Sequence, residues 1–280
     1  MENTFKIFNT DNKISWCPGC GDYSILLALK QAIFELGLKP HNTMIVSGIG
    51  QAAKTPQYVN ANSFNSLHGR ALPPALGIHM ANPDLSIFVT SGDGDTYGEG
   101  GNHFIHNVRR NPNIVHLVYD NRIYGLTKGQ TSPTTDIGTI TTNATEGNKT
   151  PPINPLQLAL TLGAGFVARG YAHHREALKA LIKKAYEFKG YAIIDIMQPC
   201  PSFNKKNTPQ WYEDNTYYTE HDVTDFNKAY ELAGHVNEHI PMGVLYAMES
   251  DPYLERVDVG PLNKRSFYGL DAKKYLSDFI

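Results

Sequence analysis

Carboxylates and glycines alternate in the segment 91–95, which reads Ser-Gly-Asp-Gly-Asp. Carboxylate oxygens are the ligands that Mg²⁺ prefers, and glycine lets the backbone approach a bulky anion closely. A Gly-Asp-Gly segment by itself is more often only a turn. Here Asn121 follows Gly94 after 26 residues and supplies a second oxygen ligand. The pair predicts a metal ion that links the protein to a diphosphate group.

Two predicted strands must bring these polar groups together. Residues 85–90 and 114–119 are apolar runs rich in β-branched residues, and each ends close to one polar group. Parallel strands joined by a helical crossover place their carboxyl ends at one sheet edge, where open α/β sheets bind ligands. We expect a crossover helix over residues 96–111, whose N-terminus, with Gly94 and Asp95, faces the diphosphate.

The spacing of the two polar groups resembles the pattern of thiamine diphosphate enzymes. The resemblance implies that the side chains of Asp93 and Asn121 hold Mg²⁺ against the diphosphate of the cofactor. It also implies that the backbone carbonyl of Ile123 is a ligand of the same ion.

Further motifs make the resemblance more specific. They are Trp-Cys-Pro-Gly-Cys-Gly at 16–21, Val-Ser-Gly-Ile-Gly at 46–50, Leu-His-Gly-Arg-Ala at 67–71, Tyr-Gly-Leu-Thr-Lys-Gly-Gln at 124–130 and Gln-Pro-Cys-Pro at 198–201. In this order, over about residues 15–203, the chain resembles the β subunit of 2-oxoacid:ferredoxin oxidoreductases. The resemblance implies an α/β fold of the thiamine diphosphate-binding type, with a mostly parallel sheet and helices on both faces.

The same resemblance implies a set of site residues. Lys54 is a candidate for binding the substrate carboxylate, although most lysines are solvated surface residues. His68 is expected against the cofactor, where an isolated histidine would otherwise more often be a hydrogen-bonded core residue. The residues expected to bind the cofactor are Ile49, Gly50, Gln51, Ala52, His68, Gly92, Gly94, Asp95, Tyr124, Gly125 and Leu126.

Three cysteines form a second candidate site. Cys17 and Cys20 form a Cys-x-x-Cys pair, which by itself fits a redox pair, half of a zinc site or part of a cluster site. The family resemblance implies a [4Fe-4S] cluster held by Cys17, Cys20, Cys200 and a fourth cysteine, at whose position this chain has Gln51. An amide oxygen is a poor ligand for cluster iron.

Several outcomes therefore stay open for the cysteines. The cluster could have a fourth ligand that is not cysteine, it could be labile or contain three irons, or no cluster could form. His68 or a residue of a partner chain could complete the site. Three buried cysteines without any ion are the structural alternative.

The activity that the resemblance implies is the oxidative decarboxylation of a 2-oxoacid, such as pyruvate or 2-oxoglutarate, with coenzyme A. The products are acyl-CoA, CO₂ and reduced ferredoxin. The activating glutamate and the pyrimidine-binding domain belong to a partner α subunit, so we expect this chain to be inactive alone and to assemble as αβ or (αβ)₂. One alternative is a non-oxidative decarboxylase subunit without a functional cluster, and another is a non-catalytic zinc- or cofactor-binding interaction subunit.

Composition limits the classes of partner. The chain has 280 residues, a formal net charge of -2 and a pI near 6.6, so we expect no nucleic-acid partner. We see neither a signal peptide nor an apolar run long enough for a membrane span. An odd number of cysteines, three, does not suit a disulfide framework. We therefore expect a cytoplasmic protein.

The remaining segments set the expected domain organisation. We expect residues 1–203 to form the thiamine diphosphate domain, in which 1–14 are a loosely ordered arm and 127–152 a long loop over the site or a partner surface. We expect residues 204–280 to be an irregular extension without another clear strand. It would wrap the domain or pack on a partner through Trp211, Tyr212, Tyr217, Tyr218, Phe267 and Tyr268.

Overall fold

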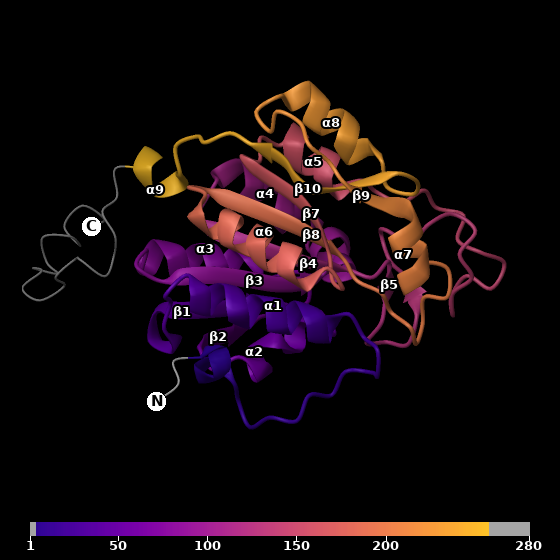
Figure 1. The fold of residues 1–280 in the computed structure, drawn as a ribbon, viewed down its shortest axis with the longest axis horizontal. Helices are drawn as coiled ribbons and strands as arrows, with labels where there is room; N and C mark the ends of the chain where they lie inside the picture. The colour runs from indigo at the N-terminus through magenta and orange to yellow at the C-terminus, as the bar shows by residue number, and fades with distance from the viewer. Residues whose placement is uncertain (1–3, 258–280) are drawn as a thin grey trace, which may run out of the picture.

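The computed structural model describes residues 4–257, and a mixed sheet runs through them (Figure 1). Within this range the sheet has eight strands in the order β2-β1-β3-β4-β8-β7-β10-β9. The strands are β1 (Thr43–Ser47), β2 (Asn62–Asn65), β3 (Ser86–Gly92), β4 (Ile114–Asp120), β7 (Phe166–Tyr171), β8 (Tyr191–Met197), β9 (Thr216–Tyr218) and β10 (Ile240–Ala247). All pairs from β2 to β7 are parallel, β10 is antiparallel to β7, and β9 is parallel to β10.

The register of the parallel strands aligns their carboxyl ends. Gly92 at the end of β3 pairs with Tyr119 of β4, and Asp120 at the end of β4 pairs with Met197 of β8. Ser47 at the end of β1 pairs with Thr90 of β3. The segments that follow these four strands therefore leave the sheet at the same edge.

Helices cover both faces of the sheet, as the sequence predicts. On one face α1 (Asp22–Glu35) and α6 (Arg175–Glu187) pack against residues such as Phe88 and Leu117. The other face is covered by α3 (Leu72–Ala81), α4 (Gly101–Arg110), α5 (Pro155–Thr161) and α8 (Phe226–Gly234). Shorter helical segments are η1 (Phe5–Phe8), η2 (Pro40–Asn42), η3 (Ala52–Lys54), α2 (Thr55–Tyr58), η4 (Gly94–Glu99), α7 (Pro209–Asn215) and α9 (Tyr253–Arg256).

Helix α1 shows how the local sequence determines an element. Its apolar side chains recur at helical spacing, so that Ile25, Leu29 and Ile33 face the sheet and are fully buried. Burial of each such side chain contributes about 1.5–3 kcal/mol. Gly37, at a φ of 74°, follows the last turn in the left-handed conformation that glycine adopts without strain. The apolar spacing and the glycine therefore account for the position and the end of this helix.

The crossover between β3 and β4 differs in detail from the single predicted helix. A π-helical turn, η4, begins directly after Asp93, and α4 follows it from Gly101. Asn111 ends α4 in the left-handed conformation, at a φ of 53°. The N-terminus of the crossover, with Gly94 and Asp95, still follows Asp93 directly. Its contact with a diphosphate stays a prediction.

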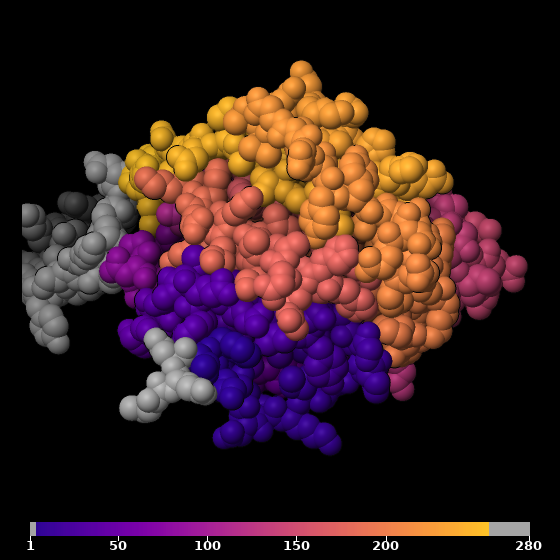
Figure 2. Space-filling view, viewed as in Figure 1, coloured from indigo at the N-terminus to yellow at the C-terminus, as the bar shows by residue number. Residues whose placement is uncertain are grey.

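The expectation that no clear strand follows Lys205 is wrong. Strands β9 and β10 extend the sheet beyond β7, and β10 carries a register shift between Val244 and Tyr246. Pro241 and Gly243 interrupt the apolar pattern of β10, so the sequence signal is weak. Figure 2 shows residues 204–257, in orange and yellow, along the upper and right sides of the molecule. Phe267 and Tyr268 lie outside the described residues, and the domain boundary after residue 203 stays a prediction.

The N-terminal segment is better ordered than the sequence suggested. Phe8 is fully buried in the core beside α1, and its carbonyl accepts a hydrogen bond from the Asn60 amide at 2.9 Å. Lys30 Nζ donates to Asn9 Oδ1 at 2.9 Å. The prediction of a loosely ordered arm is therefore wrong for residues 5–9, because one aromatic side chain and two hydrogen bonds anchor the segment.

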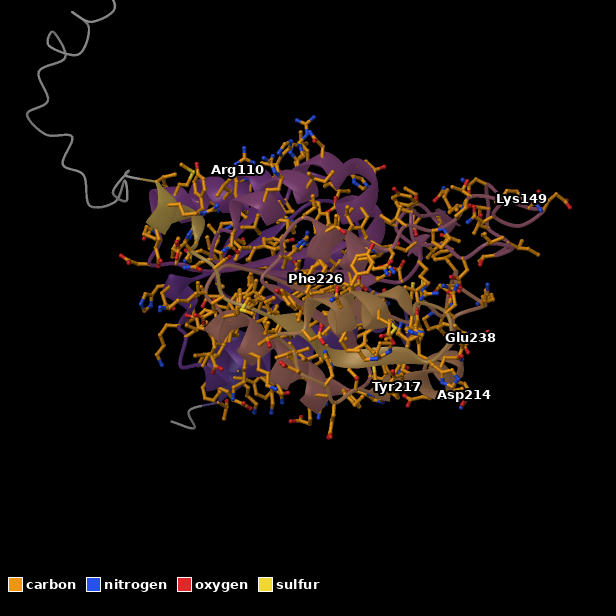
Figure 3. All side chains as sticks on the ribbon, turned by 90° about the horizontal axis from the view of Figure 1, so that it is seen from above. Arg110, Lys149, Asp214, Tyr217, Phe226 and Glu238 are labelled. Atoms are coloured by element: carbon orange, nitrogen blue, oxygen red, sulfur yellow. The ribbon has the colours of Figure 1, made fainter. Side chains whose placement is uncertain are left out.

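The predicted long loop follows β4. The loop, predicted over residues 127–152, begins between the strands of a short hairpin, β5 (Ile123–Tyr124) and β6 (Gln130–Thr131), and continues without a helix to α5. The part that carries Lys149 projects from one end of the molecule (Figure 3). Ile137 and Ile140 on this loop are 56% and 72% exposed. In the part of the chain that the structure describes, no helix has the length and apolarity to cross a membrane.

Candidate cofactor site

A pocket opens where the segments after β1, β3 and β4 meet; we call it the central pocket. Every residue that the sequence proposed for cofactor or Mg²⁺ binding lines it, and so does His68. Its lining residues are Asp22, Ile49, Gly50, Gln51, Ala52, His68, Gly92, Asp93, Gly94, Asp95, Tyr119, Asn121, Ile123, Tyr124, Gly125, Leu126 and Thr127. Motifs that are far apart in the chain thus share one cavity because their strands end at one edge.

Asp93 is a buried acid next to a second acid. Its carboxyl group is 2% exposed, and Thr134 Oγ1 lies 2.8 Å from Asp93 Oδ2 and also 2.8 Å from Asp120 Oδ1. Burial and the neighbouring Asp120 raise the pKa of Asp93 to about 8. A hydroxyl has one proton to donate, so it cannot satisfy both carboxylates at once. Two acids in this arrangement favour either a shared proton or a cation.

A left-handed turn orients the second half of the metal motif. Arg122 has a φ of 59°, which is uncommon for a residue with a side chain. Two hydrogen bonds stabilise this backbone: Arg122 N donates to Asp120 Oδ1 at 3.0 Å, and Ile123 N donates to Asn121 Oδ1 at 3.0 Å. The turn places Asn121 and Ile123 in the lining of the central pocket.

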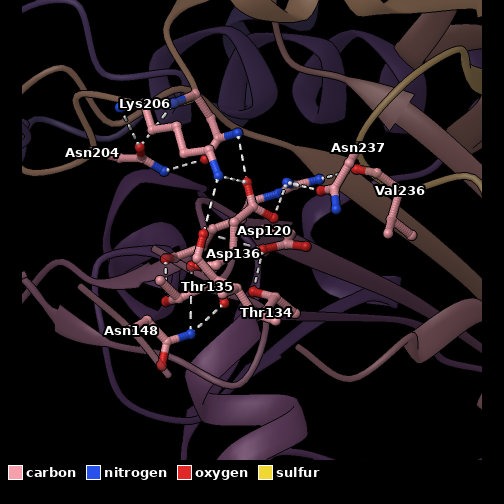
Figure 4. Close-up of polar contacts among 12 residues, drawn as sticks. Asp120, Thr134, Thr135, Asp136, Asn148, Asn204, Lys206, Val236 and Asn237 are labelled. Atoms are coloured by element: carbon pink, nitrogen blue, oxygen red, sulfur yellow. Dashed lines mark hydrogen bonds and ion pairs between the residues drawn. The ribbon is translucent and has the colours of Figure 1, made fainter. Parts of the chain in front are cut away.

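The Arg122 side chain fastens this turn to distant segments. Figure 4 labels two of its partners, Asp136 and Val236. Its Nη1 lies 2.8 Å from Asp136 Oδ1, and its Nη2 donates to the Val236 carbonyl at 2.6 Å. The guanidinium carbon also lies 5.4 Å from the centre of the Trp211 ring, within the range of a cation–π contact. The ion pair is buried on both sides. The turn at Asn121 is therefore supported from the long loop and from the C-terminal segment.

Two glycines are required by close approach. A Cβ atom at Gly94 would lie 2.2 Å from the Tyr124 ring, and one at Gly48 would lie 2.1 Å from the Asp95 carboxylate. Tyr124 in turn donates to Glu99 Oε2 at 3.0 Å. The glycines thus let the segments after β1 and β3 touch the side chains that line the pocket.

Asp95 joins three segments of the pocket wall. Its Oδ1 accepts hydrogen bonds from Gly69 N at 2.7 Å and from Ile49 N at 3.1 Å. His68 Nδ1 lies 3.0 Å from the same oxygen and 3.3 Å from Glu99 Oε2. Asp95 was predicted to contact the cofactor. In the structure its carboxylate also holds His68 and the segment after β1 that contains Ile49.

Lys54 lies apart from this set. It is half-buried at the end of η3, it is not among the lining residues, and its Nζ donates to Ser15 Oγ at 3.2 Å. A long, flexible side chain can reach beyond its position in one structure. Its predicted role in binding the substrate carboxylate stays a prediction.

The three cysteines share a second pocket, which we call the cysteine pocket. It is lined by Trp16, Cys17, Cys20, Asp22, Gln51, Asn121, Gly125, Gln198, Cys200, Pro201, Ser202 and Phe203. Gly21 N donates to the Pro199 carbonyl at 3.3 Å, which brings the Cys17–Cys20 segment against the turn after β8. Four residues, Asp22, Gln51, Asn121 and Gly125, line both pockets. The two sites therefore share a wall.

Known proteins share both the sequence and this architecture. Residues 41–196 match the family model of the thiamine pyrophosphate enzyme C-terminal TPP-binding domain, and residues 200–260 match that of the C-terminal region of the pyruvate ferredoxin oxidoreductase β subunit. The β subunit of 2-oxoacid:ferredoxin oxidoreductase 2 from Aeropyrum pernix is 42% identical over 259 residues, which cover 88% of this chain and 84% of that protein. The chain belongs to the family of 2-oxoacid:ferredoxin oxidoreductase β subunits.

Other members of this family agree with the assignment. The 2-oxoglutarate synthase subunit KorB from Methanocaldococcus jannaschii is 34% identical over 86% of this chain and 90% of its own. A solved structure of the 2-oxoglutarate:ferredoxin oxidoreductase from Magnetococcus marinus, with 2-oxoglutarate, coenzyme A and succinyl-CoA bound, superposes with a TM-score of 0.92 at 36% identity. The superposition covers 99% of this chain and 96% of the solved chain. The predicted family and the predicted α/β fold are confirmed.

The cysteine pocket of this family member is rich in unsatisfied acceptors. The buried oxygens Asp22 Oδ1, Asp22 Oδ2, Gln51 Oε1 and Gln198 Oε1 have no hydrogen-bond partner among the described residues. Burial and the nearby Asp22 raise the pKa of Cys20, and burial raises that of Cys200. Buried carboxylate and amide oxygens without donors are unfavourable unless a positive centre binds them. This donor set fits an iron-sulfur cluster.

A single metal ion fits the cysteine pocket less well. Within residues 4–257, no group of three or more His, Cys, Asp or Glu side chains is close enough to hold one ion. A zinc ion needs its four ligands within about 2.0–2.3 Å, whereas a cluster distributes its ligands over several irons. The zinc-binding interaction subunit therefore gains no support from the described residues.

Sequence reasoning missed four residues of the site: Asp22, Asp120, Arg122 and Thr134. Asp22 looks like an ordinary acid in the first turn of a helix, and Asp120 like a neighbour of Asn121. Thr134 lies in a polar loop and has no local signal that links it to Asp93, 41 residues away in the chain. The contact between Thr134 and Asp93 forms only because the long loop after β4 returns to the carboxyl edge of the sheet.

Proposed function

We propose that this chain is the thiamine diphosphate-binding β subunit of an enzyme that oxidatively decarboxylates a 2-oxoacid. With coenzyme A, the reaction would yield acyl-CoA, CO₂ and two electrons that reduce ferredoxin. The main support is the convergence of Asp93, Asn121 and Ile123 on one pocket at the carboxyl edge of the sheet. Parallel sheets of this kind bind nucleotide-like phosphates at this edge.

Mg²⁺ would be held by the Asp93 carboxylate, the Asn121 amide oxygen and the Ile123 carbonyl. The buried pair Asp93 and Asp120 supports a cation here, because the one proton of the Thr134 hydroxyl cannot satisfy both carboxylates. When bound, thiamine diphosphate supplies a carbon nucleophile and accepts the electron pair that decarboxylation releases. The protein's own contribution is to bind and orient the diphosphate through the ion and the amides after Asp93.

The pocket walls would orient the substrate. His68, fixed beside Asp95 and Glu99, would present its free ring nitrogen to the pocket, and Tyr124 closes the same side by donating to Glu99. Lys54 would attract the carboxylate of the incoming 2-oxoacid from its position at the end of η3. The walls would also exclude water from the reacting carbon.

Electrons would leave through an iron-sulfur cluster in the cysteine pocket. Cys17, Cys20 and Cys200 supply three thiolates, and the wall shared with the central pocket keeps the electron path short. A partner α subunit would carry the pyrimidine-binding domain and the activating glutamate, in an αβ or (αβ)₂ assembly in the cytoplasm. The chain alone would be inactive.

The activity can be tested on the complex of this chain with its α subunit, purified without oxygen. We expect bound thiamine diphosphate, and a coenzyme A-dependent reduction of ferredoxin with 2-oxoglutarate, pyruvate or another 2-oxoacid. The chain without its partner serves as the control and should show no turnover. An active complex that contains no thiamine diphosphate would refute the proposal.

Replacement of Asp93 tests the metal site separately. In the Asp93→Ala complex we expect Mg²⁺-dependent binding of thiamine diphosphate to weaken by at least about 100-fold, because loss of an outer partner of a ligand already costs 10–100-fold. Titration calorimetry measures the affinity, and gel filtration checks that the α subunit stays bound. Asp11→Ala, which removes an exposed carboxylate, is the control. Unchanged cofactor binding in Asp93→Ala would contradict the metal site.

A non-oxidative thiamine-dependent decarboxylase is the second candidate, and Gln51 is the observation that favours it. Gln51 stands where the family resemblance implies a cluster cysteine, and its side-chain oxygen has no partner among the described residues. Such a complex would convert the 2-oxoacid to an aldehyde and CO₂ without coenzyme A or an electron acceptor. Detection of aldehyde in a complex that has thiamine diphosphate but no iron would favour this activity.

A further inference from the structure

Asp22 is a buried carboxyl group that the fold does not use. It is the first residue of α1, yet its side chain makes no capping hydrogen bond. It is 1% exposed, and neither of its oxygens has a hydrogen-bond partner among the described residues. The nearest thiol along the chain is that of Cys20. A thiol is a weak donor and does not satisfy a carboxylate.

The carboxyl group lines the cysteine pocket together with all three cysteines. Two amide oxygens there, Gln51 Oε1 and Gln198 Oε1, also lack partners. Donors reach two of the sulfurs: Gln198 Nε2 lies 3.3 Å from Cys20 Sγ, and the backbone amides of Phe203 and Asn204 bind the Cys200 sulfur. An acceptor-rich site of this kind is stable only when positive charge binds in it.

Two oxygen-bearing side chains could complete a set of three thiolates. Gln51 stands at the position where the family resemblance implies a cysteine, but its amide is neutral and a poor ligand for iron. Asp22 is anionic when ionised, is more deeply buried than Gln51, and has two free oxygens. Charge and burial therefore favour the carboxylate over the amide.

We propose that the Asp22 carboxylate is the fourth protein ligand of an iron-sulfur cluster held by Cys17, Cys20 and Cys200. This inference rests on the oxidative function proposed above, which requires a cluster. A carboxylate is a harder ligand than a thiolate, so the iron that it binds would be the iron most readily lost on oxidation. Asp22 would bind the cluster from the wall that the cysteine pocket shares with the central pocket.

The experiment uses the complex with the α subunit, prepared without oxygen, and measures iron, sulfide and the electron paramagnetic resonance spectrum. We expect about four irons per cluster in the wild type. In Asp22→Asn we expect about three irons and, after oxidation, the spectrum of a three-iron cluster. Gln51→Ala should keep the wild-type iron content and spectrum. Gel filtration should show the α subunit still bound in Asp22→Asn, which verifies that the variant is folded.

A rescue variant tests whether the two positions serve the same iron. In the double variant Asp22→Asn, Gln51→Cys, a thiolate at position 51 should restore about four irons and resistance to oxidation. An independent measurement needs no substitution. Incorporation of aspartate labelled with ¹³C in the carboxyl group should give a ¹³C hyperfine coupling in the reduced wild-type cluster, which Asp22→Asn abolishes.

Several results would overturn the inference, and they differ from failure of the proposed function. Each of four results would exclude Asp22 as the ligand. The first two are a wild-type iron content and spectrum in Asp22→Asn, and a three-iron cluster in Gln51→Ala. The others are no rescue in the double variant and absence of the ¹³C coupling. The oxidative activity would stand in each case. A wild-type complex that contains thiamine diphosphate but binds no iron would overturn both the inference and the oxidative function.

Discussion

Asp93 and Asp120 approach the same hydroxyl group, that of Thr134, at 2.8 Å each. The arrangement makes Thr134 an outer partner of the proposed metal ligand. Outer partners orient a ligand, and their loss commonly weakens metal binding 10–100-fold. The proposed Mg²⁺ site therefore depends on a residue of the long loop as well as on the sheet edge.

Thr134→Val should weaken Mg²⁺ binding in the presence of thiamine diphosphate by about 10–100-fold. The substitution keeps the shape of the side chain and removes the hydroxyl, which leaves two buried carboxyl groups without their shared partner. Thr134→Ser keeps the hydroxyl and should stay close to the wild type. Titration calorimetry on the complex measures the difference, and equal affinities in the two variants would contradict this role.

His116 is a second buried polar residue, and it predicts how stability depends on pH. Its ring lies between Ser91 Oγ at 2.7 Å and Tyr191 Oη at 2.5 Å, and it is fully buried in β4. Burial lowers the pKa of His116 to about 3. The unfolded chain therefore binds a proton that the folded chain lacks between pH 6.5 and 3. Stability falls as the pH falls through this window and is unaffected by His116 above it.

His116→Gln should remove this part of the acid sensitivity. The difference in unfolding free energy between wild type and variant should change by about 1.4 kcal/mol per pH unit between pH 6 and 3, and should be constant above pH 7. Urea unfolding at a series of pH values measures it. A constant difference across the whole range would show that His116 titrates alike in the folded and unfolded states.

At the scale of elements, the pocket depends on loops that pack backbone against backbone. Gly69, which follows His68, has a φ of 73°, and a Cβ atom there would lie 2.3 Å from the Glu99 carbonyl carbon. The segment before α3 therefore touches the end of η4 directly. This contact keeps His68 beside Asp95 and Glu99.

Gly69→Ala should lower the free energy of unfolding by at least about 2 kcal/mol, because steric overlap and a left-handed backbone both oppose a side chain. It should also weaken thiamine diphosphate binding. Gly77 provides the matched control, since it lies within α3 and a Cβ atom there would meet nothing within 4 Å. Gly77→Ala should raise stability by up to about 1 kcal/mol. Chemical denaturation compares the two, and a similar effect of both would contradict the packing argument.

At the scale of the whole molecule, Arg122 connects three parts of the chain. It belongs to the turn after β4, pairs with Asp136 of the long loop, and binds Val236 and Trp211 of the C-terminal segment. Residues 204–257 therefore complete the support of the site instead of merely covering the domain. Figure 4 shows how the loop and the C-terminal segment meet around this group.

Arg122→Met should lower the free energy of unfolding by about 3 kcal/mol, because it breaks a buried ion pair. It leaves the Asp136 carboxylate with only the longer contacts to Lys206 at 3.4 Å and Asn207 at 3.2 Å. Amide hydrogen exchange should accelerate around residues 134–139 and 236–239. Arg175→Met is the control: Arg175 is 45% exposed, and its pair with Glu176 should contribute less than about 1 kcal/mol. If exchange accelerates equally over the whole chain, Arg122 has only a general effect on stability.

Sequence reasoning identified the chemistry of the site better than its support. The strands before Asp93 and Asn121, and the helix after Cys20, follow from local apolar patterns, and the structure confirms all three elements. Strand β10 was not predicted, because Pro241 and Gly243 interrupt its apolar pattern. The burial of Phe8 was not predicted either, because the core residues that it contacts are distant in the sequence.

The amino-acid sequence by itself determined the family, the parallel sheet and the oxygen ligands proposed for the metal, because these depend on local periodicity and on motifs of fixed spacing. Tertiary structure alone decided that Thr134 reaches Asp93, that Arg122 fastens the C-terminal segment, and that Asp22 faces three cysteines. These contacts join residues whose separation in the chain carries no periodic signal. They exist because parallel strands end at one edge and the loops return to it.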